Sequence, residues 1–200
     1  IFGHTGSADF PVTAGCLQPT FAGGPPVNFN TGYGFQQPNG TDMIVVHLNA
    51  NATVMVASTY IGGSSNDGLN NENTLQNNYG DTLRGVIMLD ANEHPVVAST
   101  TSSTDLPTLN PAQPTYGGGE QDAYCISLNP TLSSAHWATY LGGSGADAAY
   151  GVQVDSQGEV FVAGGTTSAD LPMHGTPFRS SFAGSAEGYI MRYSALGAPL

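Results

Sequence analysis

The sequence contains no lysine and only three arginines among its 200 residues. Its 15 Asp and Glu residues give a formal net charge of −12 at pH 7. Because binding to a phosphate backbone requires clustered Lys and Arg, this composition argues against a nucleic-acid-binding protein. Only 9% of the residues are charged and 40% are hydrophobic. The chain is therefore also unlike a disordered acidic tail.

Long apolar runs and a cysteine framework are missing as well. No apolar run approaches the roughly 20 residues of a membrane-spanning helix, so membrane insertion is not expected. Cys16 and Cys125 are too few for a disulfide framework. A bridge would require their Cα atoms to lie within about 7 Å, and we expect two separate small buried side chains instead. Few charges and many Asn, Ser and Thr favour an exported surface protein.

Internal repetition is the strongest feature that is present. Self-similarity at a long period is typical of solenoids, propellers and arrays. A seven-residue phrase, TxSxDxP, occurs as TGSADFP at 5–11, TSSTDLP at 101–107 and TTSADLP at 166–172. Two further phrases recur, STYIGGSSNDG at 58–68 as ATYLGGSGADA at 138–148, and GVIMLDANEHPVVAST at 85–100 as GVQVDSQGEVFVAGGT at 151–166.

The repeat unit is about 65 residues long, and two copies are extended. Asp105 and Asp170 are 65 positions apart, whereas Asp9 and Asp105 are 96 positions apart. Aligning the copies places about 15 extra residues at 25–40 and about 14 at 69–82. These two segments are called the first and second insertion.

Each unit predicts four β-strands. In the last copy the first three are 151–155, 159–164 and 188–193. The fourth would follow Leu200, and its counterpart one unit earlier is 135–141. The apolar runs are continuous, as expected when a small sheet is covered on both faces, like a propeller blade. The positions expected to be buried include Val152, Val154, Val160 and Val162.

The last copy resembles a known repeat. The series TYLGGSGADAAYGVQVDSQGEVFVAGGTTSADLP, followed by FAGSAEGYIMRYSALG, resembles the bacterial SBBP beta-propeller repeat, and its GVxVDxxGxVxVAG part is also similar to NHL-type blades. The resemblance covers the chain apart from the two insertions. It implies an all-β fold of four-stranded antiparallel blades with the GVxVD strand innermost. It also implies a large secreted or surface bacterial protein, such as cargo of gliding or type 9 secretion.

About three blades are expected within one propeller domain. Residues 1–57 would form a partial blade, 58–137 a second blade, and 138–200 a blade without its last strand. Propellers usually have 4 to 8 blades. We therefore expect other segments of a longer chain, or a completing chain, to supply the rest.

Catalytic and metal-binding motifs are not recognisable. The five histidines are scattered singly, and no nucleophile elbow, phosphate loop or dinucleotide fingerprint occurs. We expect a non-enzyme without a cofactor. Asp9, Asp105 and Asp170 have Ser and Thr oxygens nearby, which is hard-cation chemistry. We expect them instead to accept backbone N–H groups in Asx-type turns, as do Asp90 and Asp155, with at most weak calcium binding.

Three short patterns match glycosylation acceptors. Asn39-Gly40-Thr41 and Asn51-Ala52-Thr53 fit the N-linked pattern. Asp81-Thr82-Leu83 is similar to a bacterial O-linked acceptor. All three fall in predicted loops.

The two insertions should share one rim, because loops of an antiparallel meander alternate between two rims. Long loops on a rigid scaffold commonly carry function. We expect an extracellular or cell-surface scaffold for adhesion or for binding a surface protein, a secretion-apparatus protein or a glycan. A secreted hydrolase or lyase with an active site at the channel mouth, and a structural spacer, are the alternatives. The candidate contact residues are Phe29, Tyr33, Phe35, Asn71, Asn73 and Tyr79.

Overall fold

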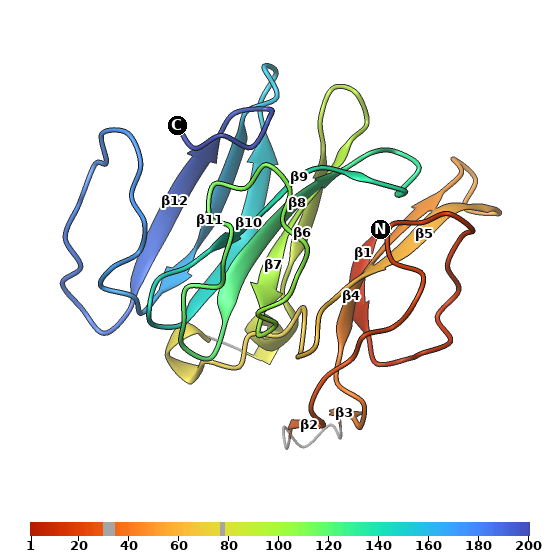
Figure 1. Cartoon of the computed structure of the whole chain (residues 1–200), viewed down its shortest axis with the longest axis horizontal. Coiled ribbons are helices and arrows are strands. Elements are labelled where there is room, and N and C mark those ends of the chain that lie inside the picture. The colour runs from red at the N-terminus through yellow and green to blue at the C-terminus, as the bar shows by residue number, and fades with distance from the viewer. Residues whose placement is uncertain (30–34, 77–78) are drawn as a thin grey trace.

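The computed structural model describes residues 1–29, 35–76 and 79–200, and within them the chain is built from antiparallel sheets (Figure 1). The helical elements in these ranges are two short 3-10 segments, η1 (Asn73–Leu75) and η2 (Tyr79–Leu83). The predicted all-β class, with consecutive blade-like sheets of three or four strands, is confirmed.

Three sheets follow one another along the chain, each a meander. The second is complete, with the order β6 (Val86–Leu89), β7 (Pro95–Thr101), β8 (Asp122–Leu128) and β9 (Ala135–Leu141). The first sheet has the order β1 (Phe2–Thr5), β4 (Asp42–Leu48) and β5 (Met55–Ile61), and the third has β10 (Asp147–Val154), β11 (Val160–Thr166) and β12 (Glu187–Tyr193). β5 and β9 thus cross the expected unit boundaries at 57/58 and 137/138.

The fourth strand of the third sheet was expected after Leu200, but its first contacts form earlier. A turn at 194–198 returns the chain, and Pro199 pairs with Tyr193 at the end of β12. The Leu200 N–H then donates to the Arg192 carbonyl over 2.9 Å. Residues 199 and 200 therefore occupy the position next to β12 that β9 occupies next to β8.

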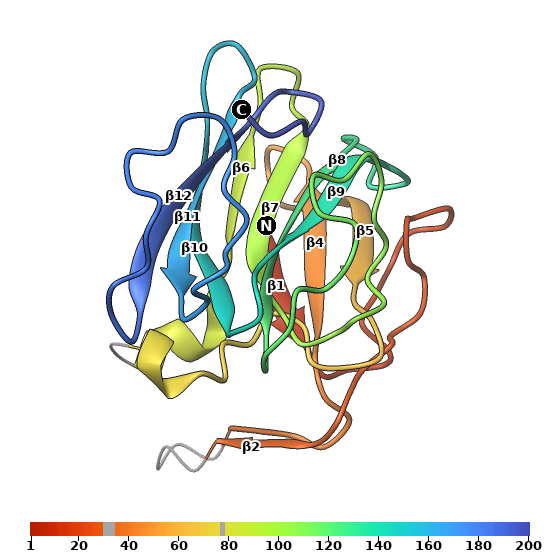
Figure 2. The same cartoon turned by 60° about the vertical axis from the view of Figure 1, so that its left-hand side comes forward.

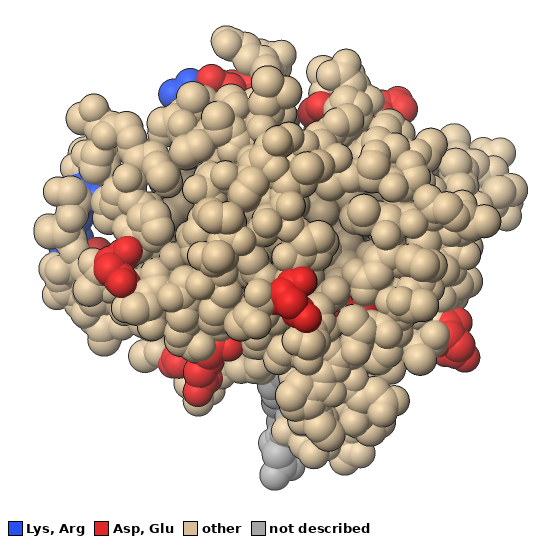
Figure 3. All heavy atoms as spheres, viewed as in Figure 1, with Lys and Arg blue, Asp and Glu red and all other residues tan. Residues whose placement is uncertain are grey.

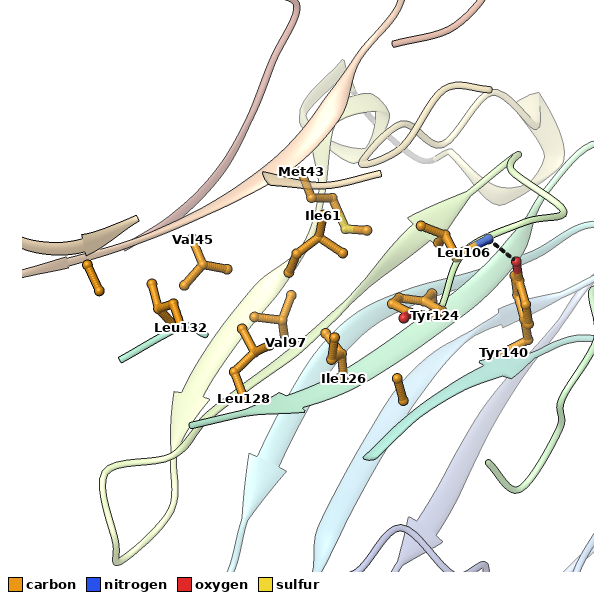
Figure 4. Close-up of a cluster of buried hydrophobic side chains, with 12 residues drawn as sticks. Met43, Val45, Ile61, Val97, Leu106, Tyr124, Ile126, Leu128, Leu132 and Tyr140 are labelled. Atoms are coloured by element: carbon orange, nitrogen blue, oxygen red, sulfur yellow. Dashed lines mark hydrogen bonds between the residues drawn. The ribbon is translucent and has the colours of Figure 1, made fainter. Parts of the chain in front are cut away.

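The sheets pack face against face, and apolar side chains fill both interfaces. Between the first two sheets, Met43, Val45 and Ile61 meet Val97 and Ile126 (Figure 4). A second cluster joins the second and third sheets, where Cys125 and Trp137 are buried with Val152, Val160 and Val162. Burying one such aliphatic side chain contributes about 1.5–3 kcal/mol. Val154 is only half-buried, contrary to expectation, because it lies near the end of β10.

The two ends of the sheets differ in their connections. The β2 (Val27–Phe29) and β3 (Phe35–Gln37) hairpin and the η1–η2 segment lie at the same end, as Figures 1 and 2 both show. This end is called the decorated rim. The opposite end carries tight turns, in which Asp90 Oδ1 accepts the Asn92 and His94 N–H groups and Asp155 Oδ1 accepts the Gln157 and Glu159 N–H groups. The Asx-type turns predicted for these two aspartates are confirmed.

Candidate interaction surfaces

Adjacent sheets are joined by a hydrogen-bonded latch around Asp67. One carboxylate oxygen, Oδ2, accepts the Gly63 N–H at 2.8 Å and the Ser103 hydroxyl at 3.0 Å. The Thr101 hydroxyl donates to Oδ1. Asp67 is fully buried. The strand that ends at Thr101 is thereby tied to the connection that leads into the second sheet.

The same latch recurs one unit later around Asp147. Its Oδ2 accepts the Gly143 N–H at 2.8 Å and the Ser168 hydroxyl at 2.7 Å. Ser168 in turn accepts the Gly145 N–H at 2.8 Å, as Ser103 accepts that of Ser65 at 2.9 Å. The Ser of the TxSxDxP phrase therefore binds the Asp of the GGSxxD phrase in both copies.

The aspartates of the TxSxDxP phrase form a second tie, but not the local one expected. Asp105 accepts the Ser64 N–H at 2.8 Å, and Asp170 accepts the Ser144 N–H at 2.8 Å. These donors lie 41 and 26 positions earlier in the chain, so the bonds join separate segments and are not local Asx turns. The Ser144 hydrogen bonds also lower the pKa of Asp170. Asp9 is exposed.

A third recurring network went unrecognised in the sequence. Gln18 and Gln113 each open a Gln-Pro-Thr phrase, and their Oε1 atoms accept the N–H of Gly62 at 2.9 Å and of Gly142 at 3.1 Å. Each glutamine lies beside the last strand of its sheet, because its carbonyl accepts the Tyr60 N–H of β5 or the Tyr140 N–H of β9, both at 3.2 Å. The repetition of Gln-Pro-Thr at 18–20 and 113–115 was the signal that could have identified it.

Buried carboxylates follow from this construction. Burial raises the pKa of Asp67 to about 7, although the hydrogen bonds from Thr101 and Gly63 oppose the shift. Burial also raises the pKa of Asp122 to about 7, and the neighbouring Asp147 carboxylate adds to the shift. Desolvation thus outweighs hydrogen bonding at both positions, because an ionised carboxylate is costly to bury.

The first insertion forms a hairpin that is anchored at its base. The Gly24 N–H donates to the Asn39 carbonyl at 2.8 Å, and Asn66 Nδ2 donates to the Pro25 carbonyl at 3.2 Å. Gly40 has a φ of +74°, and a Cβ there would lie 2.3 Å from the Gly24 nitrogen. Only glycine fits this close crossing. Figures 1 and 2 show the hairpin extending away from the sheets.

The second insertion is packed into the molecule. Leu75 is buried in a cluster with Ala146 and Ala148 of the third sheet, against which Tyr150 packs. The Gln121 side chain accepts the Asn71 N–H at 2.6 Å and donates to Asn70 at 2.6 Å. Arg84 pairs with Asp81 at 2.7 Å, and its guanidinium lies 5.3 Å from the Tyr150 ring centroid. The insertion therefore covers the junction of the second and third sheets.

The structure describes the side chains of some of the six candidate contact residues and only the backbone of others. Phe29 and Phe35 are register partners in the hairpin backbone. Asn71 is partly buried with its N–H bound to Gln121, and Asn73 is exposed at the start of η1. Tyr79 begins η2. Tyr33 lies outside the described residues, as do the side chains of Phe29, Phe35 and Tyr79.

Other groups singled out in the sequence are separate from the decorated rim. His94 Nδ1 lies 2.9 Å from Asp90 Oδ2, and its ring centroid is 4.3 Å from that of His136. Within residues 1–29, 35–76 and 79–200, no three His, Cys, Asp or Glu side chains are grouped to hold a metal ion. Cys16 and Cys125 are buried free thiols, and burial raises the pKa of Cys125.

The three glycosylation patterns differ in exposure. Asn39 and Asn51 are both exposed. Thr82 is buried, and its hydroxyl donates to Gln76 at 3.4 Å. The folded chain therefore does not present Thr82 for modification, because the second insertion is packed.

A groove with a volume of about 760 Å³ lies beside β12. Its other wall is the connection between β11 and β12 at 167–186, including Leu171, Phe178 and Phe182. Its lining includes three charged residues, Arg179, Glu187 and Arg192, and Arg179 pairs with Glu187 at 3.1 Å. On the face shown in Figure 3, the acidic side chains are spread over several places and form no single patch. The groove is mainly apolar.

The fold and its recurring latches define a chain of β-propeller blades. Residues 136–172, which run from β9 through the last TxSxDxP phrase, match the family model SBBP, described as a beta-propeller repeat. The match coincides with the copy of the latch around Asp147. The comparison with curated proteins gave no match. In the part of the chain that the structure describes, no helix is long and apolar enough to cross a membrane.

Proposed function

We propose that this chain is a non-enzymatic propeller scaffold, exported by a bacterium, that binds a protein or glycan partner through the first insertion on its decorated rim. The observation that carries the proposal is the contrast between the blades and this hairpin. The blades are tied to each other by repeated buried networks, whereas β2 and β3 form a sheet of their own.

The base of the hairpin fixes its direction. The Gly24–Asn39 hydrogen bond and the close Gly24–Gly40 crossing join its two ends, and Asn66 holds Pro25 from the next connection. A segment held in this way is presented to solvent at a defined place. Such presentation lowers the entropy cost of binding a partner.

The backbone edges of the hairpin offer a further means of binding. β2 and β3 pair only with each other among the described strands. An isolated two-stranded hairpin has two free edges, and an extended partner segment can add to such an edge. The register pair Phe29 and Phe35 also places two aromatic residues opposite each other near the described limit of the hairpin.

The second insertion favours a structural role for its part of the rim. Leu75 is buried with Ala146, Gln121 accepts the Asn71 N–H, and the Tyr150 hydroxyl donates to the Leu75 carbonyl. The spacer hypothesis thus applies to residues 69–82, and the binding hypothesis applies to the hairpin.

The test is to delete residues 26–39 and to join Pro25 to Gly40. The variant and the parent chain would be screened against a glycan array and against immobilised extracellular-matrix proteins and bacterial cells. We expect loss of a binding signal while the melting temperature stays unchanged. Asn51→Ala on the opposite rim is the matched control and should bind like the parent. Equal binding by the deletion variant would contradict the proposal.

A further inference from the structure

Two histidines that are far apart in the sequence lie against each other at the end opposite the decorated rim. The ring centroids of His94 and His136 are 4.3 Å apart, and the ring planes are inclined by 49°. His94 directly precedes β7, and His136 is the second residue of β9. The His94 side chain is 26% exposed, and His136 is exposed. The fold thus places two imidazoles side by side where solvent ions can reach them.

The turn before β7 fixes both the backbone and the ring of His94. Asp90 Oδ1 accepts the His94 N–H at 2.8 Å, and the Asp90 N–H donates to the His94 carbonyl at 3.1 Å. Asp90 Oδ2 lies 2.9 Å from His94 Nδ1. Pro95 follows, and a proline restricts the residue before it to extended backbone conformations. His94 is therefore held in one orientation before any ligand arrives.

The Asp90 carboxylate also decides which ring nitrogen of His94 carries the proton. Desolvation acts against the charged form of Asp90, but the hydrogen bonds from His94 and Asn92 outweigh it and lower the pKa of this carboxyl. An ionised carboxylate only accepts hydrogen bonds, so the proton of a neutral His94 ring lies on Nδ1 and the lone pair on Nε2. Histidines that bind metals in proteins almost always donate their other ring N–H to a carboxylate, a carbonyl or water in this way.

A β-bulge turns His136 out of the regular alternation of β9. Ser127 lies opposite Trp137, and the next residue of β8 lies opposite Ala135, so His136 is the extra residue of the bulge. Bulges re-aim side chains in this manner. β5 has a bulge at the corresponding position, which is occupied by the exposed Val56. The bulge thus belongs to the repeat, whereas the histidine on it belongs to the second sheet.

The blade itself does not require the pair of histidines. The turn at Asp155 in the third sheet has the same hydrogen bonds as the turn at Asp90. Its residue corresponding to His94 is Glu159, which pairs with Arg192 at 2.5 Å. The other sheets therefore form the same turn and the same bulge with other side chains at these positions.

The spacing of the two rings suits a single metal ion. Two imidazole nitrogens bound at 2.0–2.1 Å to one ion, at an angle near 90°, place their ring centroids about 4.5 Å apart. The observed separation of 4.3 Å is close to this value. The exposed His136 ring can rotate toward an ion bound at His94 Nε2, so the backbone need not move.

We propose that His94 and His136 bind a divalent transition-metal ion of the class that includes Zn²⁺, with water in the remaining coordination positions. Imidazole nitrogen suits Zn²⁺, Cu²⁺ and Ni²⁺, whereas Ca²⁺ and Mg²⁺ take oxygen ligands. Asp90 is a positioning residue that orients His94. With two protein ligands the site is open, unlike a closed four-ligand structural zinc site.

The test is isothermal titration calorimetry of the whole chain with ZnCl₂ in a buffer that does not chelate metals. We expect saturable binding of one ion. His94→Gln and His136→Gln should each weaken this binding at least tenfold. His174→Gln removes another exposed histidine and should bind Zn²⁺ like the parent. The melting temperature of each variant shows that it is folded.

Asp90→Asn tests the orientation of His94. The amide oxygen still accepts the backbone N–H groups of the turn, but its NH₂ group donates to His94 Nδ1 and moves the imidazole proton to Nε2. We expect Zn²⁺ binding to weaken tenfold or more. Imidazole ¹⁵N NMR spectra should show the change of tautomer at His94. Asp155→Asn, in the equivalent turn of the third sheet, is the matched control and should bind normally.

Three results would overturn the proposal: no saturable Zn²⁺ binding, unchanged binding by either His94→Gln or His136→Gln, or an equal loss in Asp90→Asn and Asp155→Asn. Binding that persists in the double variant His94→Gln/His136→Gln would assign the ion to the acidic surface of the chain, and would contradict the proposed site.

Discussion

The two insertions are of similar length and lie on the same rim, but they differ in what they contact. The first forms a hairpin whose strands pair with each other and which joins the blades at its base. The second buries Leu75 against the third sheet and binds Gln121 and Tyr150. An extended loop in a repeat can therefore be a projection or a part of the core, and only its long-range contacts decide which.

The difference has a physical origin in the neighbouring strands. Tyr150 interrupts the regular pairing of β10, where the register shifts between Ala149 and Gly151. The bulge is where Tyr150 turns toward the insertion, and its hydroxyl donates to the Leu75 carbonyl.

The largest expected effect on stability comes from removing the buried leucine side chain of the second insertion. Leu75→Ala should lower the free energy of unfolding by about 2–4 kcal/mol, because a buried leucine leaves a cavity. For a chain of this size the melting temperature should fall by about 5–15 °C. Thermal unfolding followed by circular dichroism measures it. A change below about 2 °C would mean that the second insertion is not part of the core.

The buried aspartate before the second insertion should make stability depend on pH. The pKa of Asp67 is about 7 in the folded chain, against an ordinary value of 3.8. Between these values the folded state holds a proton that the unfolded state lacks, so stability decreases as the pH rises from about 4 to about 7. The melting temperature should be lower at pH 8 than at pH 5.

Asp67→Asn isolates this contribution, because the amide keeps an oxygen acceptor without the charge. Its fall in melting temperature between pH 5 and pH 8 should be smaller than that of the parent by about 3 °C or more. Asp9→Asn, at an exposed position, controls for the change in net charge. Identical pH profiles for Asp67→Asn and the parent would show that Asp67 is not the titrating group.

A smaller effect is expected from the hydrogen bond between Tyr150 and the second insertion. Tyr150→Phe removes the hydroxyl that binds the Leu75 carbonyl, which should cost about 1 kcal/mol. The melting temperature should fall by about 2–4 °C. Gln36→Ala, at an exposed position in the described part of the first insertion, is the control. An equal loss in both variants would remove the distinction between the insertions.

The smallest effect is expected from removing the hairpin. Deletion of 26–39 should change the melting temperature by less than about 2 °C, because the described strands of the hairpin contribute no residue to the clusters between the sheets. Differential scanning calorimetry would measure the change. A fall as large as that of Leu75→Ala would show that the hairpin supports the blades.

Much of the fold could be predicted from the sequence, because the repeat places strands and turns in register. The repeat and its apolar runs located β9 to β12, and the Asp90 and Asp155 turns follow from local chemistry. The role of Asp105 could not be found locally, since its donor, Ser64, lies in the preceding connection. The packing of Leu75 depends on contacts between distant segments, which no short motif records.

Hydrogen exchange measured by mass spectrometry tests the contrast between the insertions most directly. Amides of residues 69–76 and 79–84 should exchange slowly, on the timescale of the blade strands, because their opening requires loss of the Leu75 packing. Amides of 27–29 and 35–37 should exchange much faster, since an isolated two-stranded hairpin is marginally stable. Equal rates in the two insertions, or slower exchange in the hairpin, would contradict the account.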